Sequence, residues 1–219
     1  MFKALMVIQW KWTKWAAMLA TLVGFAIPIA SVQVVASGRY SYAQEAGYVV
    51  GVMQQFAVGY ALLAAVVGLA FAVAAWSNDH KGRHIYALSL PVSRSTYAAM
   101  RFSAGAIFLL VPTLGVLAGC VIASIIAPIP AGLHAYPIAL TLRFLLASGV
   151  AFAIFFAIAA STPKTAGLVL GGVASILVVA IILAAAEVQY DLLGHVSSFL
   201  FSEPGLLSVF TGRWMLVDV

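Results

Sequence analysis

Two long apolar runs, residues 48–76 and 102–126, flank a polar stretch from Ser77 to Arg101. Each run is longer than the roughly 20 residues that an α-helix needs to cross a bilayer. The polar stretch contains four basic residues, and one Lys or Arg at the centre of a membrane helix costs roughly 2.5–3.5 kcal/mol. We therefore expect this stretch to lie in water between two membrane helices. Helix–helix connections usually have about 2–8 residues, so a loop of about 25 residues indicates a docking element.

The composition is that of a chain surrounded by lipid. Of the 219 residues, 64% are hydrophobic and 8% are charged, whereas about 25% of the residues in a soluble domain are charged. This predicts an all-α integral membrane protein with a single transmembrane domain over residues 1–219, and it leaves no room for a separate nucleotide-binding or catalytic domain. The net charge of +5 fits the positive-inside rule, so we expect no nucleic-acid partner.

The hydropathy pattern predicts five membrane spans. They cover residues 15–36, 48–76, 102–126, 140–160 and 166–186. The second run, at about 29 residues, exceeds what a crossing needs, so its helix is expected to tilt or to continue into the loop. Phe2, Trp12 and Trp15 share one side of a helix that begins at the N-terminus, and lysines lie opposite, which predicts an interfacial elbow helix over residues 1–14. The alternative is that these residues only begin the first span.

Charged residues interrupt residues 187–219, and no apolar run there is long enough to cross a membrane. We expect an extracytoplasmic tail with short helices at 192–201 and 206–210, lying on or dipping into the membrane surface. Arg143, near the outer end of the fourth span, is expected to extend its guanidinium group toward that surface.

The distribution of lysines and arginines predicts the orientation. With the N-terminus inside, eight bases lie on the cytoplasmic side and three lie outside, which is the bias of the positive-inside rule. The predicted location is the inner (cytoplasmic) membrane, as a multi-pass protein with its N-terminus and the 77–101 loop in the cytoplasm. The cytoplasmic bases are Lys3, Lys11, Lys14, Lys81, Arg83, Arg94, Arg101 and Lys164.

No group of residues has the pattern of a catalytic or metal site. The four histidines lie outside the predicted spans and the six acidic residues are scattered, whereas haem, metal and acid–base sites need clustered side chains. We predict no enzyme activity, no metal and no cofactor in this chain. Gln54, Gln55 and Tyr60 place polar groups in the second span, where they are expected either to bond neighbouring helices or to line a substrate pathway.

The polar stretch has the signals of two helices. Asn78 or Asp79 can cap a short helix that ends near Ser89, because Pro91 disfavours helix at the residue before it. Ser93 can cap the next helix, which leads into the third span. Held between two long membrane helices, the short helix would pass the motion of a bound partner into both. The alternative is a helical connector stabilised by lipid headgroups.

The same stretch contains a specific pattern of residues: Asp79, Gly82, the run LSLPVSR from Leu88 to Arg94, Tyr97 and Arg101. In these residues it resembles the first cytoplasmic loop of ABC-2 type transporter permeases. The resemblance implies a cytoplasmic coupling helix between spans two and three that docks on a separate ATP-binding subunit. The docking residues implied are Asp79, Gly82, Arg83, Leu88 and Pro91.

The resemblance also implies the assembly and the activity. Two ATP-binding subunits, which hold ATP and Mg, would join this chain and a second permease chain, identical or different. The chain would be the permease subunit of an ATP-driven exporter of a small molecule, peptide or lipid. The family has six spans, so the sixth is expected to be truncated, absent or supplied by another chain. The alternative function is a membrane anchor or assembly subunit that docks a cytoplasmic partner other than an ATPase.

Overall fold

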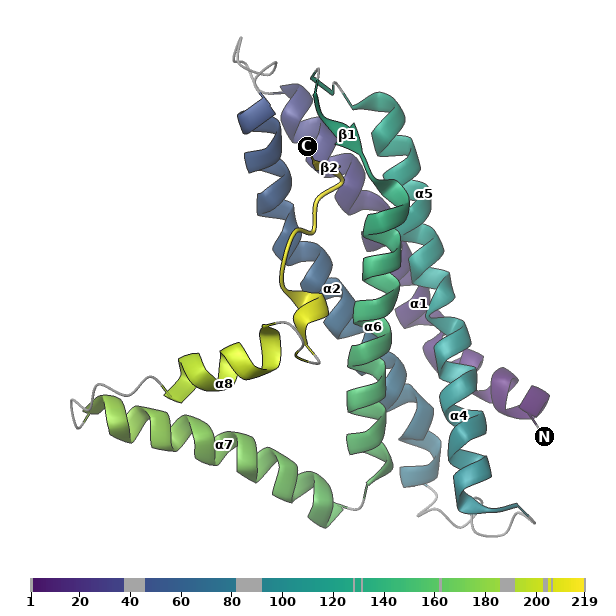
Figure 1. The fold of residues 1–219 in the computed structure, drawn as a ribbon. Helices are drawn as coiled ribbons and strands as arrows, with labels where there is room; N and C mark the ends of the chain where they lie inside the picture. Colours follow the sequence, from purple (N-terminus) through teal and green to yellow (C-terminus); the bar gives the residue numbers. More distant parts are fainter. Residues whose placement is uncertain are drawn as a thin grey trace.

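The computed structural model describes residues 2–37, 46–81, 92–127, 129–130, 132–161, 163–185, 192–202, 205 and 207–218. The helices are α1 (Phe2–Ser37), α2 (Ala46–Lys81), α4 (Arg94–Phe108), α5 (Leu110–Ile126), α6 (Pro137–Ala160), α7 (Pro163–Ala185), α8 (Leu192–Phe201) and the short 3-10 helix η2 (Ser208–Phe210). Two short strands, β1 (His134–Ala135) and β2 (Val217–Asp218), pair antiparallel at one end of the helix bundle (Figure 1). Helix thus dominates the described part of the chain, as predicted.

Four helical segments are long and apolar enough to cross a membrane: α1, the first 32 residues of α2, α4 continued by α5, and α6. They indicate a membrane protein, in agreement with the sequence. The joint between α4 and α5 is at Leu109, whose N–H lies 3.2 Å from the carbonyls of both Gly105 and Ala106. Pro112 follows three residues later, and proline has no N–H to give to the carbonyl of the preceding turn. The helical hydrogen-bond pattern therefore changes at this point without ending the span.

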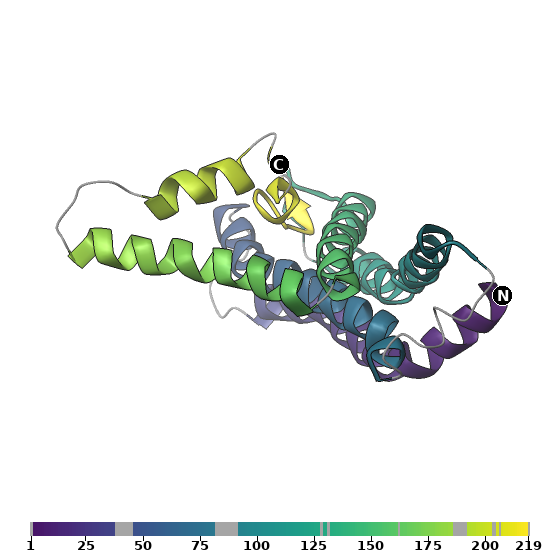
Figure 2. The ribbon, with the colours of Figure 1, turned by 90° about the horizontal axis from the view of Figure 1, so that it is seen from below.

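The predicted elbow helix and first span form one uninterrupted helix, α1, in the structure. Its first turns lie across the bundle rather than along it (Figure 2). The buried side of these turns contains Leu5, Gln9 and Thr13, while Trp12 and Trp15 are exposed. The two predicted segments are therefore one helix, because no residue between them breaks it, and the interfacial position of residues 1–14 stays a prediction.

Close approach between helices builds the core. On α2, a Cβ added to Gly68 would lie 2.6 Å from the backbone N of Phe152 on α6. On α5, a Cβ added to Gly115 would lie 2.7 Å from the carbonyl oxygen of Thr21 on α1. Small residues permit such contacts in membrane helices, where packing drives association because the lipid chains are as apolar as the protein.

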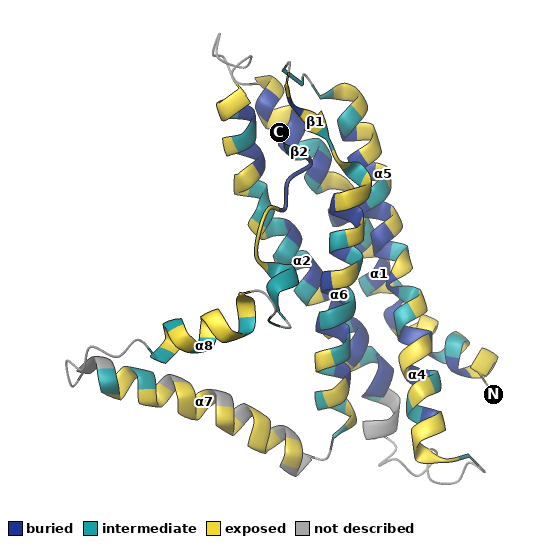
Figure 3. Cartoon of the chain, viewed as in Figure 1, coloured by how far each residue is buried: buried dark blue, intermediate teal, exposed yellow. Residues whose placement is uncertain are grey.

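Helices α7 and α8 project away from this bundle (Figures 1 and 3). The described apolar side chains of α7 include strongly exposed ones, such as Leu168 at 76%. α7 contains most of the predicted fifth span, but it is not among the four segments with the length and hydropathy of a span. The count of five spans therefore stays a prediction. α8 coincides with the short helix predicted at residues 192–201.

The polar stretch between spans two and three is helical at both ends. Ser93 caps α4 as predicted, and its Oγ accepts the Thr96 N–H at 3.1 Å. The predicted cap at Asn78 or Asp79 is wrong, because both residues lie inside α2. Nothing between Trp76 and Lys81 breaks a helix, so α2 continues as the length of its apolar run had allowed. The rest of the predicted short helix, residues 82–91, lies outside the described residues.

Candidate functional site

The C-terminal segment, residues 207–218, returns to the bundle and packs between α2 and α6 (Figure 1). Trp214, Leu216 and Val217 are buried, with Trp214 only 1% exposed. β2 pairs with β1, and the Tyr136 N–H donates to the Leu216 carbonyl at 2.8 Å. Within this segment the sequence predicted only a short helix at residues 206–210, and η2 lies there. The burial of residues 214–217 between the helices was not predicted, and the extracytoplasmic position of the tail stays a prediction.

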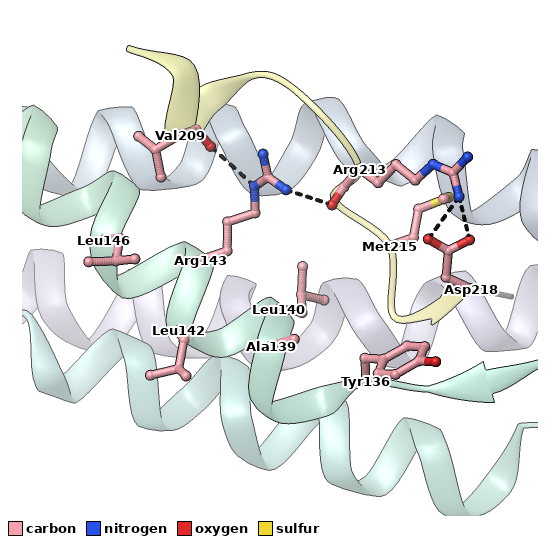
Figure 4. A pocket seen from close by; sticks show the side chains of 10 residues that line it. All are labelled: Tyr136, Ala139, Leu140, Leu142, Arg143, Leu146, Val209, Arg213, Met215 and Asp218. Carbon is pink, nitrogen blue, oxygen red and sulfur yellow. Dashed lines mark hydrogen bonds and ion pairs between the residues drawn. The ribbon is translucent and has the colours of Figure 1, made fainter. Parts of the chain in front are cut away.

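Arg143 on α6 holds the C-terminal segment through its backbone. The guanidinium group donates to the carbonyls of Val209 at 3.2 Å and of Arg213 at 3.0 Å (Figure 4). It also donates to the carbonyl of Thr211. Gly212 lies between Thr211 and Arg213, and its positive φ of 85° favours glycine. A Cβ added there would also lie 2.8 Å from a guanidinium nitrogen of Arg143. Three of the five N–H donors of Arg143 are thus engaged by this segment, and its expected extension toward the membrane surface stays a prediction.

No carboxylate pairs with Arg143 among the residues that the structure describes. Its hydrogen bonds go to neutral carbonyls, and its guanidinium carbon lies 5.3 Å from the centre of the Trp214 ring. Asp218, the acidic residue nearby, pairs instead with Arg213 at 2.9 Å. Among the described residues, the positive charge of Arg143 is thus solvated by carbonyl dipoles and an aromatic ring.

Of the three polar residues predicted for a pathway, two lie beside the C-terminal segment. Tyr60 is 1% exposed and its ring stacks on Trp214, with the centroids 6.5 Å apart and the planes inclined by 9°. The Tyr60 hydroxyl makes no hydrogen bond with any described residue. Both glutamines are exposed, and of the two only Gln54 lines the cavity against the segment. The structure therefore brings Tyr60 and Gln54 to one site.

Two cavities lie on either side of the C-terminal segment. One, of about 420 Å³, is bounded by α6, and the other, of about 600 Å³, is bounded by α2. Arg213, Met215 and Asp218 line both cavities, so the segment forms the partition between them. Each cavity has aliphatic walls and a few charged or amide groups, which suits an amphipathic ligand better than a small polar one.

The second predicted site, the docking loop, is described only at its edges. Asp79 lies in the last turn of α2, and Gly82, Arg83, Leu88 and Pro91 lie outside the described residues.

Arg101, expected in the watery 77–101 loop, is buried within α4 at 2% exposure. It donates to the Ala75 carbonyl at 2.5 Å and, through two nitrogens, to the Tyr97 hydroxyl at 2.8 and 3.0 Å. The contact with the Ala75 carbonyl joins α4 to α2.

Comparison with protein-family models, with curated proteins and with solved structures found no match for this chain. No group of three or more metal-ligating side chains occurs in the described ranges. The arrangement at the C-terminal segment is therefore interpreted from its own chemistry.

Sequence reasoning missed Arg143, Trp214 and Arg213 as members of one site. A signal was present, because an arginine inside an apolar span usually has a specific partner. That partner is a backbone segment about 70 residues away along the chain, and no sequence pattern marks carbonyl acceptors.

Proposed function

We propose that this chain is the permease subunit of an ATP-driven transporter of the ABC-2 type, an exporter of a small molecule, peptide or lipid. The observation that carries the proposal is the junction formed by Arg101. This arginine is the last residue of the family-like motif, and it ties α4 to α2 through the Ala75 carbonyl. The motif therefore connects two helices, α2 and α4, that are also joined to each other by this hydrogen bond.

This junction supports a coupling mechanism. A partner that displaces the 82–91 loop acts on the end of α2 and the start of α4 together, because Arg101 and Tyr97 link them. α2 is one continuous helix of 36 residues, which corresponds to roughly 54 Å at 1.5 Å per residue. Its half that is remote from residues 82–91 contains Gln54, which lines a cavity beside the C-terminal segment, and Tyr60, whose ring stacks on Trp214. Motion at the loop is in this way transmitted to the candidate site.

The experiment is co-purification of the full chain from its native membrane in mild detergent. We expect an ATPase to accompany the wild-type protein, and Arg83→Glu or Leu88→Asp to release it and to lower its ATP turnover. Lys11→Glu, the same charge reversal at an exposed position of α1, is the matched control and leaves the complex intact.

If both loop variants retain the ATPase and its ATP turnover is unchanged, the proposed coupling through residues 82–91 is contradicted. Loss of a partner that has no ATPase activity would instead favour the role of a membrane anchor or assembly subunit.

A further inference from the structure

We infer that the cavity between α6 and the C-terminal segment binds one anionic glycerophospholipid, with its phosphate on Arg143 and an acyl chain along the outer face of α6. This inference goes beyond transport and holds whether or not the chain couples to an ATPase. It depends on charge, on free donors, on the shape of the cavity and on its depth in the membrane.

The charge of the cavity calls for one anion. Arg143, Arg213 and Asp218 are the charged residues that line it. Asp218 pairs with Arg213 through two contacts, at 2.9 and 3.2 Å, so no carboxylate among the described residues compensates the charge of Arg143. A cation in a membrane helix is costly unless it is paired, so a single negative group in this cavity would stabilise the site.

Arg143 retains donors for that group. A guanidinium group has five N–H donors, and the carbonyls of residues 209, 211 and 213 use three of them. The remaining two suit the paired oxygens of a phosphate, for which arginine has matching planar geometry. The side chain is also held in place by the carbonyls and by Trp214, so binding would cost little further side-chain entropy.

The walls of the cavity indicate an amphipathic ligand rather than a free ion. Leu142 and Leu146, one turn apart on α6, line the same cavity as Arg143 and are 54% and 62% exposed. In Figure 4 they project away from the C-terminal segment, while the Arg143 guanidinium points toward it. An acyl chain lying over these leucines would place its headgroup beside the arginine.

The depth of Arg143 also fits a lipid phosphate. Arg143 is six residues beyond Pro137, about 9 Å along the helix axis. α6 has 24 residues and is about 36 Å long, against a hydrocarbon core of about 30 Å. The Cα of Arg143 therefore lies within about two turns of the membrane surface, from which an arginine side chain reaches the headgroup layer. Tyr136, which is exposed and of a residue type typical of this layer, lines the same cavity.

The test uses the full chain, delipidated in a zwitterionic detergent and examined by native mass spectrometry with dioleoyl phosphatidylglycerol or dioleoyl phosphatidylcholine. We expect the wild-type protein to retain one phosphatidylglycerol at least tenfold more strongly than phosphatidylcholine. Equal retention of the two lipids would overturn the inference. Soluble glycerol 3-phosphate in hundredfold excess should not displace the lipid, and displacement would overturn the assignment to a lipid.

Two substitutions separate charge from structure at the same position. Arg143→Gln and Arg143→Lys both disturb the contacts with the C-terminal segment, but only the first removes the charge. We expect phosphatidylglycerol retention to fall at least tenfold in Arg143→Gln and to stay within threefold of wild type in Arg143→Lys. Lys3→Gln, which removes a charge from an exposed position of α1, should leave retention unchanged. Equal losses in the two Arg143 variants, or no loss in either, would overturn the inference.

Discussion

The contact between Arg143 and the C-terminal segment predicts that Arg143→Gln releases the segment from the bundle. Three hydrogen bonds from the guanidinium group to carbonyls are lost. Hydrogen bonds from charged groups contribute about 1.5–3 kcal/mol each, but two of these lie at exposed positions, so we take about 1 kcal/mol per bond. The sum, about 3 kcal/mol, corresponds to an opening equilibrium shifted about a hundredfold.

The opening can be measured by the modification of one engineered thiol. Cys120 is the single cysteine of the chain and is buried, so a Cys120→Ser background with Leu216→Cys reports on the segment alone. Position 216 is buried in the closed state, and a maleimide reaches it only after opening. We expect its labelling rate to rise about a hundredfold in Arg143→Gln and to stay unchanged in Lys3→Gln.

A thiol at Leu193, which is exposed on α8, gives the rate for an accessible site. It should label at the same rate in every variant. The reasoning would be refuted if labelling at position 216 changed by less than twofold in Arg143→Gln. It would also be refuted if labelling were already as fast as at position 193 in the wild-type background.

Three further substitutions test the packing. Gly68→Ala should lower the free energy of unfolding by about 1–3 kcal/mol, because the backbone of α6 lies 2.6 Å from the added Cβ. Gly59→Ala on the same helix is the control, since its added Cβ has its nearest neighbour 4.0 Å away and should change the thermal midpoint little. Equal shifts of the thermal midpoint in the two variants would contradict the packing. Gln9→Met should raise the thermal midpoint, because the buried Gln9 amide makes no hydrogen bond with any described residue and an unsatisfied polar group costs about 1–3 kcal/mol. Gln33→Met, at an exposed position of the same helix, is the control. A lower midpoint for Gln9→Met would indicate that the amide has a partner. Ser93→Ala should lower the stability of the protein by about 1 kcal/mol and speed amide hydrogen exchange in the first turn of α4, because the helix loses its cap. Ser93→Asp should preserve the cap. Unchanged exchange in Ser93→Ala would show that the cap contributes nothing.

Local patterns in the sequence were sufficient for most of the helical architecture. The four segments with the properties of spans coincide with predicted apolar runs, since the need to satisfy backbone groups in lipid makes such runs helical. Ser93 was recognisable as a cap, and residues 192–201 as a helix, from neighbouring residues alone.

Local reasoning was less reliable where a helix could continue or a polar residue could be buried. Asn78 and Asp79 are good capping residues, yet α2 passes through them, because capping preference is weak where nothing breaks the helix. Arg101 was expected in water, but the Tyr97 hydroxyl and the Ala75 carbonyl permit its burial. A charge count cannot foresee such acceptors.

The candidate site was determined by tertiary contacts. The sequence by itself identified a lipid-embedded helical chain, its apolar segments and the polar residues of its second span, because hydropathy and capping act over a few turns. Only the folded structure brought Arg143 to carbonyls 66 to 70 residues further along the chain and placed Trp214 on Tyr60. Such contacts depend on where a returning segment finds space between helices, which is a property of their packing and has no periodic signal in the sequence.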